Sequence, residues 1–165
     1  ATLAIAEYDG PVYLRFGRPK VPIFIPEDMP FEIGKGILLN EGTDVTIVAT
    51  GHLVWKALEA AKELEAKGIS AEVINIHTIK PLDEEIILNS VMKTKCVVTA
   101  EEHQIAGGLG ESVSSLLCRT IPTPQEFVAV DDTFGESGTP DELMTKYGLD
   151  AVDIISACEA VIKRK

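Results

Sequence analysis

The stretch CVVTAEEHQIAGGLGESVSSLL, residues 96–117, decides how this chain folds. It begins with an apolar run at 96–100, continues through the polar group at 101–104 and crosses the glycine pair Gly107 and Gly108. Apolar side chains then recur at the spacing of one helix face, at Leu109, Val113, Leu116 and Leu117. The pattern predicts a buried strand, a loop, a glycine turn and a helix. In an open α/β sheet, the loop after the carboxyl end of a strand is where ligands and partners bind.

The sequence before this stretch alternates apolar strands with an amphipathic helix. Residues 45–50 (VTIVAT) and 71–76 (AEVINI) are apolar runs of the kind found in fully buried strands. Between them, residues 53–67 carry an apolar stripe on one helix face and charges on the other, and Gly68 is suited to end that helix. The order strand, helix, strand predicts a right-handed parallel crossover.

The remaining elements continue the alternation. We expect a short strand at 37–39, a helix capped by Asp83, and a last strand at 126–132. A further helix has Thr139 as its N-cap, followed by a proline at the first helical position and a capping-box acid, and Asp150 caps the final helix. Five strands and five helices in near alternation predict an α/β fold, a three-layer α/β/α sandwich around a mostly parallel sheet.

The first 33 residues have a different character. Residues 1–10 are typical of the tail of a helix, and VYLRF at 12–16 alternates like a short strand that has no partner nearby. Four prolines then indicate an extended connector: Pro19, Pro22, Pro26 and Pro30. We therefore expect 1–18 to be the last piece of another domain, 19–33 a proline-rich linker, and 34–165 the compact domain.

Composition excludes some classes of partner. The chain has 165 residues, a formal net charge of -11 and 45% hydrophobic residues, which suits one domain with a core of its own. So negative a surface repels nucleic acids and anionic membranes, and we expect neither as a partner. The sequence contains no run of about 18 apolar residues that could cross a bilayer.

The cysteines favour a reducing compartment. Cys96, Cys118 and Cys158 are odd in number, far apart and placed within apolar patterns, with no CxxC pair among them. We expect three buried free thiols. No basic segment followed by an apolar stretch marks a signal peptide, so we expect a cytoplasmic location.

Several strings together resemble the C-terminal domain of transketolase and its relatives. They are TAEEHQIAGGLGESV (99–113), NIHTIKPLD (75–83), DVTIVATG (44–51) and GESGTPDELMTKYGLD (135–150). Upstream, GPVYLRFGR (10–18) resembles the end of the pyrimidine-binding domain of that family. The resemblance covers nearly the whole chain and implies a five-stranded, mostly parallel sheet with one antiparallel strand near the start. It also implies that 1–18 is a remnant of the pyrimidine-binding domain.

The resemblance implies a transferase that moves a two-carbon ketol unit between phosphorylated sugars, as in the pentose phosphate pathway. The implied cofactors are thiamine diphosphate and a divalent metal. The GDG-type motif and the activating glutamate that hold and use them in the family are absent from these 165 residues. We therefore expect the isolated chain to bind neither cofactor and to be inactive. Its expected partners are thiamine-binding domains or a thiamine-binding subunit, within a homodimer.

Two alternatives remain open within related thiamine enzymes. The domain could be a non-catalytic assembly module, as in the β subunit of 2-oxo acid dehydrogenases, or part of a deoxyxylulose-phosphate synthase. The strings TIKPLD and EEHQIAGGLG look more like transketolase than like the dehydrogenase subunit. Deoxyxylulose-phosphate synthases usually have asparagine where His103 stands.

Arg18 is the strongest single candidate for a functional residue. It ends LRFGR, and the resemblance carries over to it an arginine that binds the phosphate of the sugar substrate. A guanidinium can hold a phosphate through two parallel hydrogen bonds. The alternative is a surface ion pair or an anchor for the linker. Arg15, on the expected strand, is interpreted as structural.

Glu101, Glu102 and His103 follow the central strand. The resemblance implies that they lie at a subunit interface or near the active site and do not contact the cofactor. Adjacent residues of an extended chain point apart, so the two glutamates are interpreted as hydrogen-bonded loop residues, not as an acid/base pair. A histidine can move protons near neutral pH, which leaves catalysis by His103 as the less favoured alternative.

Three further features have both a functional and a structural interpretation. The IAGGLG turn could hold a phosphate, but its spacing and Glu111 in the first helical turn favour tight packing instead. His52 and His77 each follow a strand, without the spacing of a metal site. The acids at 131, 132 and 136 could bind a hard cation, although acidic loops are usually only solvated.

Overall fold

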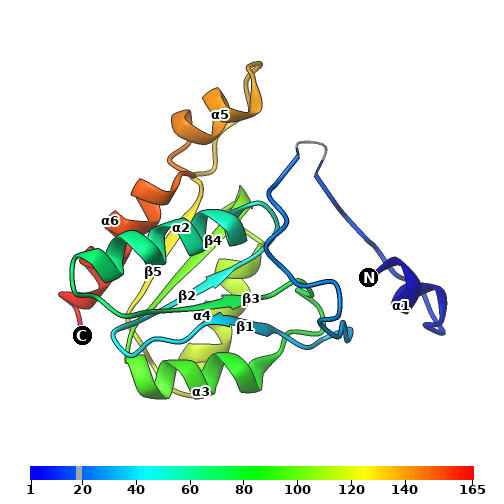
Figure 1. Ribbon diagram of the computed structural model, residues 1–165, viewed down its shortest axis with the longest axis horizontal. Coiled ribbons are helices and arrows are strands. Elements are labelled where there is room, and N and C mark those ends of the chain that lie inside the picture. Colours follow the sequence, from blue (N-terminus) through cyan, green and yellow to red (C-terminus); the bar gives the residue numbers. More distant parts are fainter. Residues whose placement is uncertain (18–19) are drawn as a thin grey trace.

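A five-stranded sheet forms the centre of the computed structural model, which describes residues 1–17 and 20–165. The strands lie in the order β1 (Ile37–Asn40), β3 (Ala71–Asn75), β2 (Val45–Ala49), β4 (Val97–Gln104) and β5 (Gln125–Val130). β1 runs antiparallel to β3, and the other neighbouring strands are parallel (Figure 1). The expected mostly parallel sheet with one antiparallel strand is confirmed.

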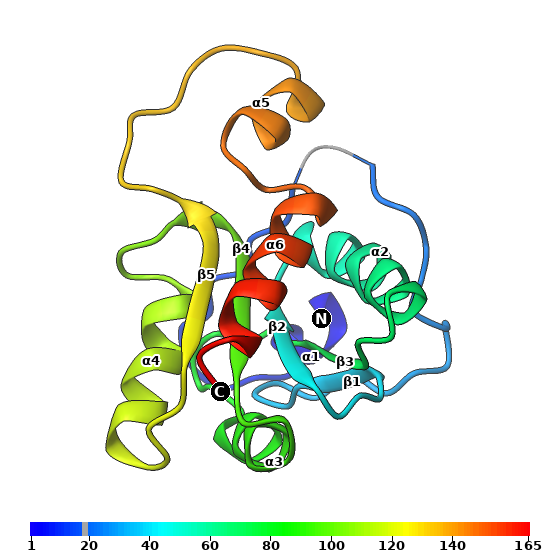
Figure 2. The ribbon, with the colours of Figure 1, turned by 90° about the vertical axis from the view of Figure 1, so that its left-hand side faces the viewer.

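Helices cover both faces of this sheet, which gives the expected three layers. α2 (Leu53–Ala66) and α6 (Ala151–Ile162) pack on one face, and α3 (Glu84–Thr94) and α4 (Leu109–Arg119) pack on the other (Figure 2). Two short helices, α1 (Thr2–Ala6) and α5 (Pro140–Lys146), lie outside these layers (Figure 1).

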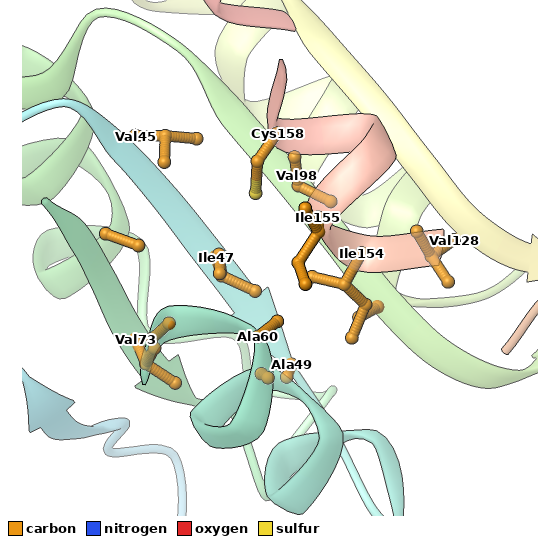
Figure 3. Packing of buried hydrophobic residues seen from close by; sticks show 14 of the residues in the cluster. Val45, Ile47, Ala49, Ala60, Val73, Val98, Val128, Ile154, Ile155 and Cys158 are labelled. Atoms are coloured by element: carbon orange, nitrogen blue, oxygen red, sulfur yellow. The ribbon is translucent and has the colours of Figure 1, made fainter. Parts of the chain in front are cut away.

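Two apolar clusters, one on each side of the sheet, hold the layers together. Because side chains alternate along a strand, Ile47 of β2 faces α2 and α6 while its neighbour Val48 faces α3 and α4. Figure 3 shows the first cluster, in which Ile154 and Cys158 of α6 approach the sheet. Burying an isoleucine or valine side chain contributes about 1.5–3 kcal/mol, so these runs must be buried for the domain to fold.

The helix ends follow the signals in the sequence. The Asp83 carboxylate accepts a hydrogen bond from the Ile86 amide at 3.3 Å, which caps α3. Thr139 and Glu142 form the expected capping box of α5. Gly68 has φ +80°, the left-handed conformation that ends a helix at little steric cost.

Two expectations from the sequence are wrong. Residues 12–16 do not form a strand, because none of the other described residues offers them a ladder of backbone hydrogen bonds. Cys118 is exposed, since Val113, Leu116 and Leu117 form the buried face of α4 and Cys118 points outward. Cys96 and Cys158 are buried as expected.

A third correction concerns residues 101–104, which continue β4 and do not form a loop. β5 stays beside them, with Gln104 opposite Val130 after an irregularity that follows Ala100. In the part of the chain that the structure describes, no helix is long and apolar enough to span a bilayer.

The segment before β1 passes along the edge of the sheet where the parallel strands end (Figure 1). Phe24 packs against Trp55 of α2, with 5.8 Å between the ring centroids. Phe31 packs against His77, which follows β3, at 4.3 Å. The proline-rich segment before the domain is thus held against this edge at two points, Phe24 and Phe31.

Candidate functional site

Glu101 is the central residue of the carboxyl edge. It is an acid on β4 with only 2% of its surface exposed. Its two carboxylate oxygens accept hydrogen bonds from the amides of Leu109 at 2.9 Å and Gly110 at 2.8 Å. These are free amides at the start of α4, where the helix dipole favours a negative charge. Burial acts to raise the pKa of Glu101, but His103 and the two amides outweigh it and lower the pKa below its ordinary value.

The glycines of the turn make room for this carboxylate. A side-chain carbon on Gly108 would lie 2.2 Å from a Glu101 oxygen, and one on Gly110 would lie 2.5 Å from the Phe127 ring. Gly107 has φ +81°, and its amide donates to Glu111 at 2.7 Å. The amides that a phosphate would need are already bonded to carboxylates. The interpretation of the turn as a packing element is confirmed.

His103 links Glu101 to the segment before the domain. Its Nδ1 lies 3.6 Å from a Glu101 oxygen, and its Nε2 contacts the guanidinium of Arg15. A guanidinium can only donate, so Nε2 must be the acceptor and the proton of the neutral imidazole belongs on Nδ1, toward Glu101. Nε2 of His103 is therefore engaged by Arg15, and Nδ1 is turned toward Glu101.

Glu102 points the other way and forms a second acid–histidine pair. Its Oε2 lies 2.7 Å from Nδ1 of His52, which directly precedes α2. On the other side of that ring lies Gly17, where a side-chain carbon would come within 2.3 Å of Nε2. The two adjacent glutamates diverge, as the extended chain predicts.

His77 is set apart from these pairs. Its Nδ1 lies 2.9 Å from the Thr78 hydroxyl, and its Nε2 is buried with no hydrogen-bond partner among the described residues. Burial lowers the pKa of His77. The ring therefore favours the neutral form.

The other sequence candidates are accounted for as follows. Arg18 lies outside the described residues. Residues 131, 132 and 136 are exposed, and Glu136 bonds Lys146 at 2.6 Å. Within residues 1–17 and 20–165, no group of three His, Cys, Asp or Glu residues could hold a metal ion.

Sequence reasoning did not anticipate the contacts of Arg15 and Gly17. Arg15 and His103 are separated by 88 positions, so no local spacing could have linked them. The arrangement as a whole consists of two acid–histidine pairs at the end of β4 and the start of α2, each in contact with residues 15–17. It can hold a chain segment in place, and it presents no nucleophile paired with a base.

The family described as "Transketolase, C-terminal domain" matches residues 34–154. The "6-deoxy-6-sulfo-D-fructose transketolase subunit SqwH" of Clostridium sp. (strain MSTE9) is 48% identical over 161 residues, which are 98% of this chain and 50% of that protein. The "1-deoxy-D-xylulose-5-phosphate synthase 1" of Geobacter sulfurreducens is 41% identical over 163 residues, 96% of this chain and 25% of that protein.

A solved structure described as "Split gene transketolase, inactive beta4 tetramer" matches this chain with a TM-score of 0.94 and 49% sequence identity. The match covers 98% of this chain and 55% of the chain in that structure. This chain therefore spans about half the length of a split transketolase subunit and a smaller share of the synthase.

Proposed function

The chain belongs to the family of transketolase C-terminal domains, and from this we propose that it is the C-terminal part of an enzyme that transfers a two-carbon ketol unit between phosphorylated sugars. One observation carries the proposal: 48% identity over 98% of the chain with a transketolase subunit. The match with this relative over 98% of the chain extends beyond residues 34–154, the span of the family model.

In this proposal the domain has two tasks. It supports assembly with thiamine-binding domains or a thiamine-binding subunit. It also serves the substrate contact, in which Arg18 of this chain binds the phosphate of the sugar. The proposed assembly is at least a homodimer, and the tetramer named for the similar split-gene structure supports association between copies of such a subunit. The proposed location is cytoplasmic.

Thiamine diphosphate and its metal would supply the chemistry that stabilises the two-carbon carbanion. The described residues offer no group of three acids, histidines or cysteines to hold the metal, and the amides at the start of α4 are bonded to Glu101. These residues do not fit the cofactor, and we place it on the partner domains. The chain's own part is to bind and orient.

The name of the Clostridium relative suggests a wider range of donors. A sulfonate, like a phosphate, is a tetrahedral anionic group with oxygens that accept from a guanidinium. We therefore include ketoses with a terminal sulfonate among the donors to be tested. A guanidinium at Arg18 can bind either group by the same pair of hydrogen bonds.

A second candidate is the formation of 1-deoxy-D-xylulose 5-phosphate, because a synthase of that name is 41% identical over 96% of the chain. His103 argues against it, since that class resembles the rest of the string but usually has asparagine at this position. The Nε2 that contacts Arg15 has no equivalent in an asparagine side chain.

The test is product analysis with the complete enzyme. The protein is assembled with its thiamine-binding part, cofactor and magnesium, and supplied with a ketose phosphate labelled with ¹³C at its first two carbons and an unlabelled aldose phosphate. A parallel reaction contains pyruvate in place of the ketose phosphate. We expect a product two carbons longer than the acceptor, with both labels adjacent. A 1-deoxy product formed from pyruvate with release of carbon dioxide would support the second candidate and overturn the first.

A further inference from the structure

We propose that the two acid–histidine pairs, Glu101–His103 and Glu102–His52, position residues 15–17, which directly precede Arg18 in the sequence. We call them the anchoring pairs. The inference rests on the proposed function for Arg18 and adds positioning residues to it. Its basis is that each pair contacts a different residue of 15–17, from two different elements of the domain.

The first anchoring pair has a rigid base. Glu101 is buried and bonded to two amides of α4, so its position is fixed by the core and not by solvent. Its carboxylate lies 3.6 Å from Nδ1 of His103, and Nε2 of the same ring accepts from Arg15. His103 itself is 40% exposed, so its ring would have other orientations if Glu101 did not restrict it.

The second anchoring pair fixes the path of the backbone. His52 is 18% exposed and bonded to Glu102, and Gly17 lies against its ring so closely that no side chain would fit. Gly17 directly precedes Arg18 in the sequence. A ring held in place by Glu102 therefore sets where the chain stands one residue before the arginine that is proposed to bind phosphate.

Together the pairs reduce the freedom of the segment before substrate arrives. Ordering a residue costs backbone entropy, and a site that is ordered in advance does not lose that entropy on binding. The expected consequence is a lower Michaelis constant for phosphorylated substrates with little effect on the chemical step.

The test uses four variants of the full chain. His103→Asn retains a donor toward Glu101 but lacks the Nε2 acceptor, whereas His103→Gln places an oxygen near the Nε2 position. Gly17→Ala introduces a collision with His52. Gly135→Ala is the matched control, because a side-chain carbon there meets nothing within 4 Å.

Trypsin cleavage after Arg15 reports the first contact, because trypsin must take the Arg15 side chain away from His103. Lys20 serves as the reference site in the same segment. We expect His103→Asn to raise the rate of cleavage after Arg15, relative to Lys20, about tenfold, the loss that corresponds to one hydrogen bond to a charged group. His103→Gln should restore part of the protection, and Gly135→Ala should match the unmodified chain. Equal rates for the unmodified chain and His103→Asn would overturn the proposal.

Kinetics of the complete enzyme test the positioning role. We expect His103→Asn and Gly17→Ala to raise the Michaelis constant for phosphorylated sugars about tenfold, with kcat changed less than about twofold and unphosphorylated sugars unaffected. Faster cleavage after Arg15 with an unchanged Michaelis constant would overturn positioning. If the unmodified enzyme transfers no two-carbon unit, the proposed function fails, and cleavage after Arg15 still decides whether His103 holds the segment.

Discussion

Replacing Glu101 by alanine should destabilise the domain more than any other single change at its carboxyl edge. The carboxylate is the acceptor for the buried amides of Leu109 and Gly110, and alanine would leave both without a partner. An unsatisfied buried group costs about 1–3 kcal/mol, so two of them should lower the free energy of unfolding by about 2–6 kcal/mol. For a domain of this size, each kcal/mol corresponds to a shift in Tm of about 2–4 °C. We expect a fall in Tm of about 4–24 °C.

Thermal unfolding followed by circular dichroism measures this change, with Glu111→Gln as the control. Glu111 lies in the same helical turn and accepts one hydrogen bond, from Gly107, but it is exposed, so its replacement should cost less than about 1 kcal/mol. Glu101→Gln keeps the shape and one acceptor, and it should fall between the two. If Glu101→Ala unfolds no earlier than Glu111→Gln, the carboxylate does not hold α4 and the reasoning about the turn is refuted.

Three other expected outcomes concern thiols, a close backbone approach and pH. Under native conditions the exposed thiol of Cys118 should react quickly with Ellman's reagent, and Cys118→Ser should abolish that reaction. Cys96 and Cys158 should react slowly, because they are buried and burial raises the pKa of each. Rapid labelling of Cys158 would contradict the packing of α6. In a urea titration, Gly42→Ala should lower the free energy of unfolding by about 1–3 kcal/mol or more, because the added carbon would lie 2.2 Å from the Ala71 backbone. Gly135→Ala should leave the free energy of unfolding unchanged, since the added carbon meets nothing within 4 Å. Burial lowers the pKa of His77 below its ordinary 6.5, so the stability that depends on neutral His77 should be complete above that pH and fall as the pH drops toward the folded-state pKa. Between thermal melts at about pH 7.5 and about pH 5.5, the Tm of His77→Gln should therefore fall less than the Tm of the unmodified chain. An equal fall in Tm would show that His77 is not the group responsible.

Local patterns in the sequence predicted the domain because its fold depends on local signals. The apolar runs of β2 and β3, the stripe of α2 and the caps at Asp83 and Thr139 all act within a few residues, and the structure has each of them. The antiparallel first strand was not visible in any pattern and followed only from the resemblance.

The errors arose where a distant part of the chain decides the outcome. The alternation in 12–16 satisfies the pattern of a strand, but a strand also needs a neighbour, and pattern alone cannot supply one. Residues 101–104 have the polar composition of a loop, yet they continue β4 because β5 extends alongside them. Glu101 can be buried because two amides of α4 donate hydrogen bonds to its carboxylate.

The candidate site was predicted only in part for the same reason. Glu101, Glu102 and His103 were identified from their place after an apolar run, but their partners Arg15, Gly17 and His52 are distant in sequence. A contact across such a separation has no periodicity. Nothing in LRFGR distinguished Arg15, which contacts His103, from any other charged residue.

Arg18→Ala in the complete enzyme is the most direct test of the central claim, that this chain contributes the phosphate contact of a two-carbon transfer. Loss of a charge-assisted contact should reduce kcat/KM for phosphorylated sugars about tenfold to a hundredfold, mainly through a higher Michaelis constant. Unphosphorylated acceptors should be nearly unaffected, and Arg18→Lys should recover only part, because an ammonium group lacks the planar pair of donors. Equal losses for phosphorylated and unphosphorylated sugars would contradict the claim and assign Arg18 a structural role.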